Sequence, residues 1–483
     1  MITMTLAEVA AVTGGRLHRA TGDEQVTSVE FDSRKAAPGV LFLALPGERV
    51  DGHSFAAAAV AAGAAGVLAA REVDAPSVVV PPAAGAAGTY LAENDPDGAG
   101  AAVLAALAKL ARHSVDSLTD DSLEGLAVVG VTGSSGKTST KDLLAAVLAP
   151  LGPTVAPPGS FNNELGHPWT ALRADAGTRH LVLELSARGP GHIAALCRIA
   201  PPRIGVVLNV GRAHLGEFGS PEAIAQAKGE LVEALPAGGV AVLNADAPAV
   251  AAMATRTAAR VVPVGRGADA LVRAVDVTSD AGRARFRLVT PAGEADVALR
   301  LVGAHHVGNA LSAAAVALEL GATPAGVAES LSAAAPASRW RMEVADRADG
   351  VTVVNDAYNA NPESMRAALE ALADLGRDRR TWAVLGRMAE LGDTEAAAHA
   401  EVAGAAAALG VGTLVAVGEP GYGPAARHVT DPAAALALLR AEVSPGDVVL
   451  VKASRAVGLD RVADALLNDT PRDDRQENEL VSR

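Results

Sequence analysis

Short apolar runs that end in glycine or a polar residue recur through the middle of the chain from residue 126 onward. They read LAVVGVTG, LVLELSA, IGVVLNV and GVAVLNAD, and helix-like stretches separate them. Buried strands that alternate with helices are typical of a parallel sheet covered on both faces. This part of the chain is therefore expected to form a doubly wound, mainly parallel α/β sheet.

The flanking regions follow other patterns. The N-terminal region holds shorter strand-like runs around an Ala-rich helix, and residues 271–302 alternate like antiparallel strands. After residue 336 the strand–helix alternation restarts with VTVVND, TWAVLG, TLVAVG and DVVLVKAS. A chain of 483 residues is too long for one ordinary core. We expect an α/β protein with domains at residues 1–100, 101–335 and 336–467, and a frayed tail at 468–483.

Composition narrows the class of protein. Half of the residues are apolar and a fifth are charged, as in soluble globular proteins. The formal net charge of −14 argues against a nucleic-acid partner, because phosphate backbones require a basic surface. Cys197 is the single cysteine, which fits a reducing compartment. Neither a basic signal-peptide segment nor a run of 18 apolar residues is present. We therefore expect a cytoplasmic protein without stable membrane insertion.

Lysine is rare in this chain. Only six of the 41 basic residues are lysine and the remaining 35 are arginine. A lysine that persists under such a bias hints at a position where arginine would not serve. The six are Lys35, Lys109, Lys137, Lys141, Lys228 and Lys452.

A glycine-rich segment at residues 128–141, VVGVTGSSGKTSTK, joins an apolar strand to the start of a helix. Backbone N–H groups at such a helix N-terminus bind phosphate oxygens. Lys137 would reach the β- and γ-phosphates, and the Thr138 hydroxyl would ligate Mg²⁺. Val131 stands where the full phosphate-loop pattern has glycine, but the shorter core is intact. The nucleotide-binding residues predicted here are Gly133, Ser134, Ser135, Gly136, Lys137, Thr138 and Ser139.

Three further residues suggest metal ligands, and each has a plainer interpretation. Glu184 ends the run LVLE, so it would lie at the carboxyl edge of the sheet, where ligands bind. It could instead be a capping or salt-bridged glutamate. His214 follows another strand end, where a structural histidine is the commoner case. Lys228 lies in the helical stretch PEAIAQAKGELVEAL and is by default a solvated lysine.

The whole chain apart from its tail resembles the Mur ligases. An ordered series of segments carries the resemblance: FDSRKAAPGVLFLALPGERVDGHSF, TGSSGKTST, SFNNELGHP, LVLELSARGPGHI, NVGRAHLGEFGSPEAIAQAKGEL, VLNADAP, GAHHVGNALSA, SRWRMEV, VVNDAYNANPESM, VLGRMAELGD and VLVKASRAVGLDRV. The NDAYNANP run is similar to the corresponding segment in the branch of the family that adds D-alanyl-D-alanine. The Asn-Pro-Arg signature of the branch that adds the third peptide residue is absent.

The resemblance implies an ADP-forming peptide ligase that uses ATP and two Mg²⁺ ions. ATP would convert the carboxylate of UDP-N-acetylmuramoyl-tripeptide to an acyl phosphate, which the amine of D-alanyl-D-alanine attacks. The product would be the UDP-linked pentapeptide for peptidoglycan synthesis, and the enzyme is expected to be a monomer. The first domain would recognise the UDP-sugar, the second would hold ATP and Mg²⁺, and the third would close on ATP and present the dipeptide.

The resemblance also implies roles for single residues. Thr138 and Glu184 would hold one ion, and His214 with a carbamate on Lys228 would hold the other. Asn162 or Asn163 would position the reacting carboxylate or a metal, and which of them acts is open. The remaining roles fall on Lys137 and Arg341 at the phosphates, Asn309 at adenine, Asp356 at ribose, and Asn359, Asn361 and Ser454 at the dipeptide.

The N-terminal domain carries a candidate site for the UDP substrate. Asp32, Ser33 and Arg34 lie on a turn after an apparent strand, which suits hydrogen bonds to uracil or to the diphosphate. The alternative is a turn held by an Asp–Arg pair. Elsewhere four positions depart from the family's pattern, without touching the phosphate loop or the metal ligands: Asn355, His306, Arg387 and Ala453.

Three rival functions remain open at this point. A sister ligase would add a different amino acid by the same chemistry, and the NDAYNANP run argues against it. A non-catalytic protein could use ATP as a conformational switch, but it would not need to retain a second metal site. The intact residues argue against it: Lys137, Glu184, His214 and Lys228. A plain phosphate-loop ATPase or kinase would leave the outer domains unexplained, and no kinase catalytic loop is present in the sequence.

Overall fold

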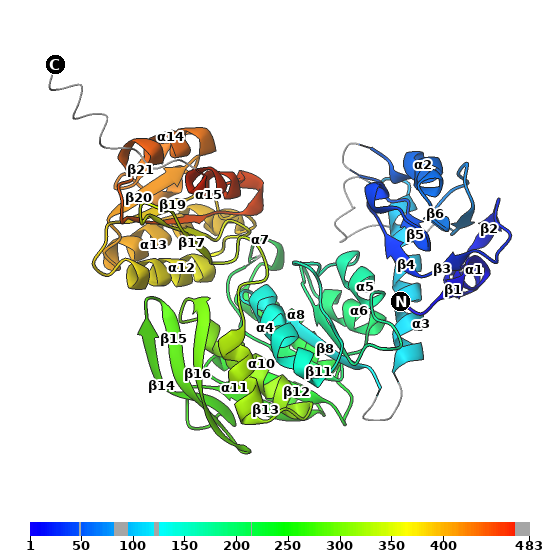
Figure 1. The fold of residues 1–483 in the computed structure, drawn as a ribbon, viewed down its shortest axis with the longest axis horizontal. Helices are drawn as coiled ribbons and strands as arrows, with labels where there is room; N and C mark the ends of the chain where they lie inside the picture. Colours follow the sequence, from blue (N-terminus) through cyan, green and yellow to red (C-terminus); the bar gives the residue numbers. More distant parts are fainter. Residues whose placement is uncertain (48–49, 82–94, 120–124, 214, 469–483) are drawn as a thin grey trace.

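The structure is a computed structural model that describes residues 1–47, 50–81, 95–119, 125–213 and 215–468. Figure 1 shows three lobes along the chain, and each contains a sheet with helices beside it. Strands and helices alternate in all three, so the predicted α/β class is confirmed. Residues 82–94, which precede the domain boundary expected after residue 100, lie outside the described residues, as does the tail beyond residue 468.

The first lobe holds a five-stranded sheet of order β2-β7-β6-β5-β4, in which only the β2–β7 pair is antiparallel. Helix α1 begins where Thr5 and Glu8 form a reciprocal capping box. The elements are β1 (Met4–Thr5), α1 (Leu6–Thr13), β2 (Arg16–His18), β3 (Gln25–Val26), β4 (Ser28–Glu30), η1 (Ser33–Lys35), β5 (Val40–Leu43), η2 (Gly52–Phe55), α2 (Ala56–Ala61), β6 (Gly66–Ala69) and β7 (Ser77–Val79).

The second lobe holds a nine-stranded sheet of order β16-β15-β14-β13-β12-β11-β8-β10-β9. Strands β8 to β14 pair in parallel, whereas β14, β15 and β16 pair antiparallel, which confirms the patch expected at residues 271–302. The strands are β8 (Ala127–Thr132), β9 (Thr154–Val155), β10 (His180–Glu184), β11 (Ile204–Val207), β12 (Val240–Asn244), β13 (Arg260–Gly265), β14 (Val272–Asp280), β15 (Arg283–Thr290) and β16 (Gly293–Val302).

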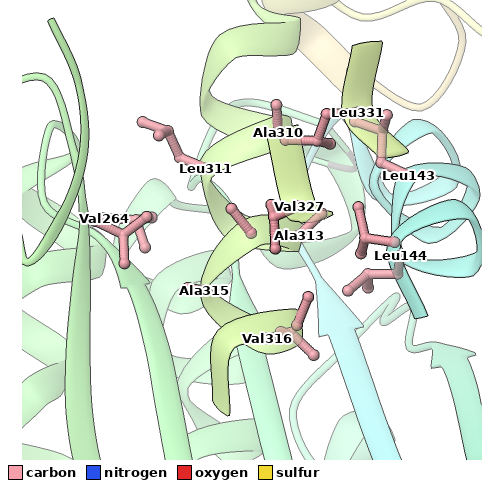
Figure 2. Packing of buried hydrophobic residues seen from close by; sticks show 14 of the residues in the cluster. Leu143, Leu144, Val264, Ala310, Leu311, Ala313, Ala315, Val316, Val327 and Leu331 are labelled. Atoms are coloured by element: carbon pink, nitrogen blue, oxygen red, sulfur yellow. The ribbon is translucent and has the colours of Figure 1, made fainter. Parts of the chain in front are cut away.

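Helices cover both faces of this central sheet. Apolar side chains of α4, α10, α11 and β13 meet in one buried cluster, part of which Figure 2 shows. This cluster fixes α4, and with it the loop at its N-terminus, on the sheet. The helices of this lobe are α4 (Lys137–Leu148), η3 (Ala149–Leu151), α5 (Gly166–Ala171), α6 (His192–Ile199), α7 (Leu215–Phe218), α8 (Pro221–Glu233), α9 (Pro248–Ala251), η4 (Ala252–Arg256), α10 (His306–Glu319) and α11 (Pro324–Ala333).

The third lobe holds a six-stranded sheet of order β17-β18-β22-β19-β20-β21, parallel except for the β17–β18 pair. Two apolar clusters, one on each face, give it a core of its own. The elements are β17 (Glu343–Asp346), β18 (Thr352–Asn355), α12 (Pro362–Leu375), β19 (Thr381–Leu385), η5 (Gly392–Thr394), α13 (Glu395–Ala408), β20 (Thr413–Val417), η6 (Pro420–Tyr422), β21 (Arg427–Val429), α14 (Pro432–Glu442), β22 (Val448–Lys452), η7 (Arg455–Val457) and α15 (Asp460–Leu467).

Helix α3 (Ala99–Leu118) joins the first two lobes through a shared core. Its Val103 and Leu107 belong to one apolar cluster with Leu41 of the first sheet and with Val128 and Leu181 of the central sheet. The first two sheets are therefore packed into one hydrophobic unit. Across the described ranges, we find no helix that combines the length and the apolar character needed to cross a membrane.

Candidate active site

A cleft of about 1050 Å³ lies between the second and third lobes. The phosphate loop lines it, together with the carboxyl ends of central strands and the first loops of the C-terminal sheet. Ligands bind at this edge of open α/β sheets, because loops that diverge from the strand ends leave a crevice there. The predicted site residues that line the cleft are Ser134, Ser135, Gly136, Lys137, Thr138, Ser139, Asn162, Asn163, Asn309, Arg341, Asp356, Asn359 and Asn361.

The phosphate loop follows β8 and ends at α4, as its sequence predicts. Gly136 has φ 81°, and a Cβ atom there would lie 2.8 Å from Oδ1 of Asn309, so the loop requires glycine. The Lys137 ammonium donates to the Gly133 carbonyl at 2.7 Å. Burial lowers the pKa of Lys137, and the nearby charge of Glu184 opposes that shift. A half-buried lysine and open helix N–H groups together suit phosphate oxygens.

Asn209, which follows β11, holds this loop in shape. Its Oδ1 accepts a hydrogen bond from Ser135 N at 3.0 Å, and its backbone oxygen accepts one from Ser134 N at 3.3 Å. A role for Asn209 was not predicted from the sequence. Its position at the carboxyl end of a parallel strand was the available signal.

Glu184 ends β10 and is fully buried beside α4. Its Oε2 accepts hydrogen bonds from Thr138 Oγ1 at 3.3 Å, from Ser160 Oγ at 3.2 Å and from Asn162 Nδ2 at 3.3 Å. Its Oε1 is also buried, and it has no hydrogen-bond partner among the described residues. A buried, unpartnered carboxylate oxygen costs free energy unless a cation or a donor satisfies it. Glu184 and Thr138 therefore fit a hard cation such as Mg²⁺.

Lys228 lies on α8 and is only 5% exposed. The interpretation as a solvated helix lysine is therefore wrong. Burial, with a smaller contribution from the charge of Lys137, lowers the pKa of Lys228 well below its ordinary value. The predicted ligand His214 lies outside the described residues. A neutral buried amine fits the carbamate expected here, because only the neutral amine reacts with CO₂.

The two adjacent asparagines have different surroundings. Asn162 faces Glu184 and also donates to Ser160 Oγ at 2.9 Å. Asn163 turns to the backbone, and its Oδ1 accepts from Leu165 N at 3.3 Å and from Gly166 N at 2.9 Å. Asn162 therefore lies with the candidate metal ligands, whereas Asn163 holds the turn that leads into α5.

Arg341 crosses from the third lobe to the phosphate loop. Its Nη2 donates to Thr138 Oγ1 at 3.2 Å, and its guanidinium lies 4.0 Å from the centre of the Tyr358 ring. The structure places this arginine at the phosphate loop, and its predicted contact with the phosphates stays a prediction. Cation–π stacking fixes the plane of the group. Arg341 lines the cleft, and its Nε is buried without a hydrogen-bond partner among the described residues.

We assigned two residues, Asn309 and Asp356, to nucleotide binding. In the structure, both of them are in contact with other protein groups. Asn309 lies against the phosphate loop, and its Nδ2 is 3.4 Å from Nδ1 of His306. Both carboxylate oxygens of Asp356 are engaged: Oδ2 accepts from Lys452 Nζ at 2.6 Å and Oδ1 from Met342 N at 3.1 Å. The contacts with adenine and ribose stay predictions. Lys452 was missed, although its survival as one of the six lysines was a signal.

The residues proposed for the dipeptide divide between the cleft and the fold. Asn359 and Asn361 line the cleft, and Asn361 also caps α12 by accepting a hydrogen bond from Ser364 N at 2.9 Å. Ser454 accepts from Ala389 N at 2.9 Å and does not belong to the cleft lining. Its placement favours a structural role in the C-terminal lobe.

The Asp32–Arg34 turn lies in the first lobe, away from the lining of this cleft. Asp32 accepts hydrogen bonds from Nε, Nη2 and N of Arg34, and the side-chain hydrogen bond from Arg34 is the main cause that lowers the pKa of Asp32 to about 2. The Asp32–Arg34 pair, which was the alternative interpretation of this turn, is therefore present in the structure. The side chain of Arg34 is nevertheless 88% exposed, so it remains accessible to a ligand.

An aromatic contact joins this turn to the central lobe. Phe31, the residue before it, lies 5.6 Å from the Trp169 ring and 6.2 Å from the Phe161 ring. Trp169 Nε1 donates to Val29 O at 2.9 Å. Phe161 directly precedes Asn162, so the turn is attached to the segment that reaches Glu184.

Comparison with known proteins agrees with this geometry. The Mur ligase catalytic-domain model matches residues 25–114, the Mur ligase middle-domain model residues 131–317, and the Mur ligase glutamate ligase domain model residues 340–455. The UDP-N-acetylmuramoyl-tripeptide–D-alanyl-D-alanine ligase of Mycobacterium tuberculosis strain H37Rv is 56% identical over 512 residues, covering 97% of this chain and 98% of the relative. The chain belongs to the Mur ligase family.

More distant members of the Mur ligase family agree. The relative of the same name from Escherichia coli strain K12 is 35% identical, covering 96% of this chain and 99% of the relative. The crystal structure of MurF from Acinetobacter baumannii superimposes with a TM-score of 0.83 at 29% identity, covering 97% and 99% of the two chains. MurF from Thermotoga maritima in complex with ADP gives a TM-score of 0.76 at 30% identity, covering 91% and 96%. The chain is therefore a peptide ligase, and the predicted family and enzyme class are confirmed.

Proposed function

We propose that this enzyme joins D-alanyl-D-alanine to UDP-N-acetylmuramoyl-tripeptide with cleavage of ATP to ADP and phosphate. The name shared by relatives that match it from end to end supports the substrates. The chemistry rests on one observation: Thr138 of the phosphate loop and Asn162 both donate hydrogen bonds to the buried carboxylate of Glu184. The cytoplasmic location and the monomeric state remain part of this proposal.

In the proposed reaction, ATP activates the carboxylate of the tripeptide. A carboxylate oxygen of the tripeptide attacks the γ-phosphorus, and ADP leaves with the electrons of the broken bond. The amine of D-alanyl-D-alanine then attacks the acyl carbon, gives up a proton, and expels inorganic phosphate. Lys137 and Arg341 are placed at the phosphate loop to stabilise the negative charge that moves between these oxygens.

The residues around Glu184 fit a divalent cation. Thr138 and Glu184 would hold one Mg²⁺, and His214 with a Lys228 carbamate would hold a second, so that the ions neutralise phosphate charge during transfer. Asn162 and Ser160 keep Glu184 in place through its Oε2, which leaves Oε1 for the ligand. Arg341 and Asn361 both contact the phosphate loop, so this side of the cleft lies against the place where the acyl phosphate would form.

The direct test incubates the purified protein with ATP, Mg²⁺, D-alanyl-D-alanine and the UDP-linked tripeptide. Mass spectrometry should detect the UDP-linked pentapeptide. Replacing the dipeptide by single amino acids tests the sister-ligase alternative, and a product with one of them but not with the dipeptide would refute our assignment. ATP binding without any product would favour a non-catalytic switch.

The acyl phosphate makes a separate prediction about the fate of oxygen. With ¹⁸O in the reacting carboxylate, one labelled atom should appear in inorganic phosphate, because the carboxylate oxygen that attacks phosphorus leaves with it. The nucleotide product should be ADP. Phosphate mass analysis and nucleotide chromatography measure both, and AMP with pyrophosphate would exclude this route.

The exposed guanidinium of Arg34 predicts a binding effect confined to the UDP substrate. Arg34→Ala should raise KM for the UDP-linked tripeptide by about tenfold, because a charge-assisted hydrogen bond is lost, and should leave KM for ATP unchanged. The turn itself should persist, since Asp32 still accepts from the backbone N of residue 34. Arg16→Ala, which removes an exposed arginine paired with Glu72 in the same lobe, is the matched control. A joint rise of both KM values would mean that the lobe has unfolded.

A further inference from the structure

A short strap, residues 334–342, connects α11 to β17 and therefore the second lobe to the third. It is attached to α4 at two points. Near its middle, Ser338 N donates to Asp142 Oδ2 at 3.1 Å, and Lys141 Nζ donates to Ser338 Oγ at 3.3 Å. Near its end, Arg341 donates to Thr138 as described above. The helix positions 138, 141 and 142 are spaced by three and four residues, so they share one face of α4.

The first attachment rests on a buried ion pair. Lys141 is 3% exposed, and its ammonium hydrogen-bonds the Asp142 carboxylate beside it. The same ammonium donates to Pro157 O at 2.9 Å, just before the segment that carries Ser160 and Asn162. Buried ion pairs add little net stability, because desolvation offsets their attraction, but they fix geometry. The pair thus joins the phosphate-loop helix, the segment beside Glu184 and the strap.

The strap beyond Ser338 has an unusual backbone. Trp340 and Met342, on either side of Arg341, have φ of 59° and 51°, a region that L side chains rarely adopt. Contacts hold both residues there: Trp340 N donates to Glu343 Oε2 at 3.1 Å, and Met342 N donates to Asp356 Oδ1 at 3.1 Å. Such conformations persist where the surroundings over-determine them. Here they set the direction in which the side chain of Arg341 leaves the strap.

We propose that Lys141 and Asp142 are positioning residues for the ligase reaction, which fix the strap at Ser338 so that Arg341 reaches the phosphate loop. This inference rests on the proposed function, in which Arg341 stabilises the phosphate in transfer. Neither Lys141 nor Asp142 lines the cleft, so they act through Arg341 and not on the substrate. A small displacement of the Arg341 guanidinium would lower the rate of phosphoryl transfer, because that rate depends on precise positioning. It would leave the affinity for ATP in the ground state unchanged.

Asp142→Asn tests the attachment with little change of volume. The carboxylate uses Oδ1 for Lys141 and Oδ2 for Ser338, and the amide has one oxygen, so one of the two contacts must be lost. We expect kcat to fall about tenfold while the Kd for ATP, measured by calorimetry, stays within about twofold. Asp349→Asn is the matched control. Asp349 is 11% exposed against 12% for Asp142, pairs with Arg347 and accepts a backbone N–H, but lies away from the cleft.

A double-mutant cycle with Arg341→Ala distinguishes positioning from general stability. If Asp142 acts through Arg341, Asp142→Asn should change kcat by less than about twofold once Arg341 is absent. Independent, multiplicative losses in the double variant would overturn the proposal, as would an equal loss of kcat in Asp349→Asn. An inactive wild-type protein would instead overturn the proposed function.

Ser338→Ala provides a second variant if Asp142→Asn does not fold. It removes the contact with Lys141 Nζ and keeps the backbone N–H that bonds Asp142. We expect a smaller loss of kcat, about threefold, which also disappears in the Arg341→Ala background. A wild-type rate for this folded variant would contradict the role that we give to Lys141.

Discussion

Lys228→Arg and Lys228→Ala should each lower kcat by about 10²–10³-fold while retaining the fold and much of the ATP binding. The reason is that the carbamate, an anion with two oxygens, cannot form on either replacement. Acetate or formate should restore part of the activity of the alanine variant by supplying the missing oxygens. Steady-state rates with and without these ions measure the effect. Lys109→Arg is the control, because Lys109 donates a hydrogen bond to Thr13 O on another helix and does not belong to the cleft lining.

Replacing Lys228 by an apolar residue should keep or raise the stability of the fold, although it lowers the activity. Between the lowered pKa of the folded state and the ordinary value of 10.5, the unfolded chain binds a proton at Lys228 that the folded chain does not bind. The lysine therefore lowers the free energy of unfolding throughout this window when no CO₂ is present. Lys228→Met should keep or raise Tm in CO₂-free buffer while abolishing turnover. Full activity of Lys228→Arg, without any response to carboxylates, would refute the carbamate.

The second large effect is expected for Glu184→Gln. The amide cannot supply the anionic oxygen at the position of Oε1, so the affinity for Mg²⁺ should fall by about 10–100-fold and kcat by about 10²–10³-fold. Initial rates over a Mg²⁺ titration separate the two parameters. Ser160→Ala, which removes one of the three hydrogen bonds to Oε2, should shift the Mg²⁺ dependence in the same direction by less. An unchanged Mg²⁺ dependence in Glu184→Gln would show that the ion binds elsewhere.

The positions in the fold that the sequence predicted correctly are those fixed by local pattern. The Gly133–Thr138 loop lies between a strand and a helix as its spacing requires, and Glu184 projects from the carboxyl end of β10 because parallel strands share that edge. Periodicity also distinguished the antiparallel strands after residue 271 from the parallel ones before it.

Contacts between distant segments could not be predicted from pattern. Ser338 and Asp142 are separated by 196 positions, and Lys452 and Asp356 by 96, so nothing local marks either pair. The local sequence did not indicate that Lys228 is buried either, because the spacing of apolar residues in α8 is compatible with a lysine on either face of the helix. Its burial depends on which face of α8 packs on the central sheet, and that is a tertiary property.

The core that α3 shares with the first two sheets has a consequence for synthesis of the chain. Leu41 and Val103 emerge from the ribosome well before Val128 and Leu181, which complete the same apolar cluster. At about 5–20 residues per second, this interval lasts several seconds, during which the first lobe presents an unfinished apolar face. The first lobe and the central sheet therefore mature together during translation, whereas the C-terminal sheet, with clusters on both of its faces, can fold as a later unit.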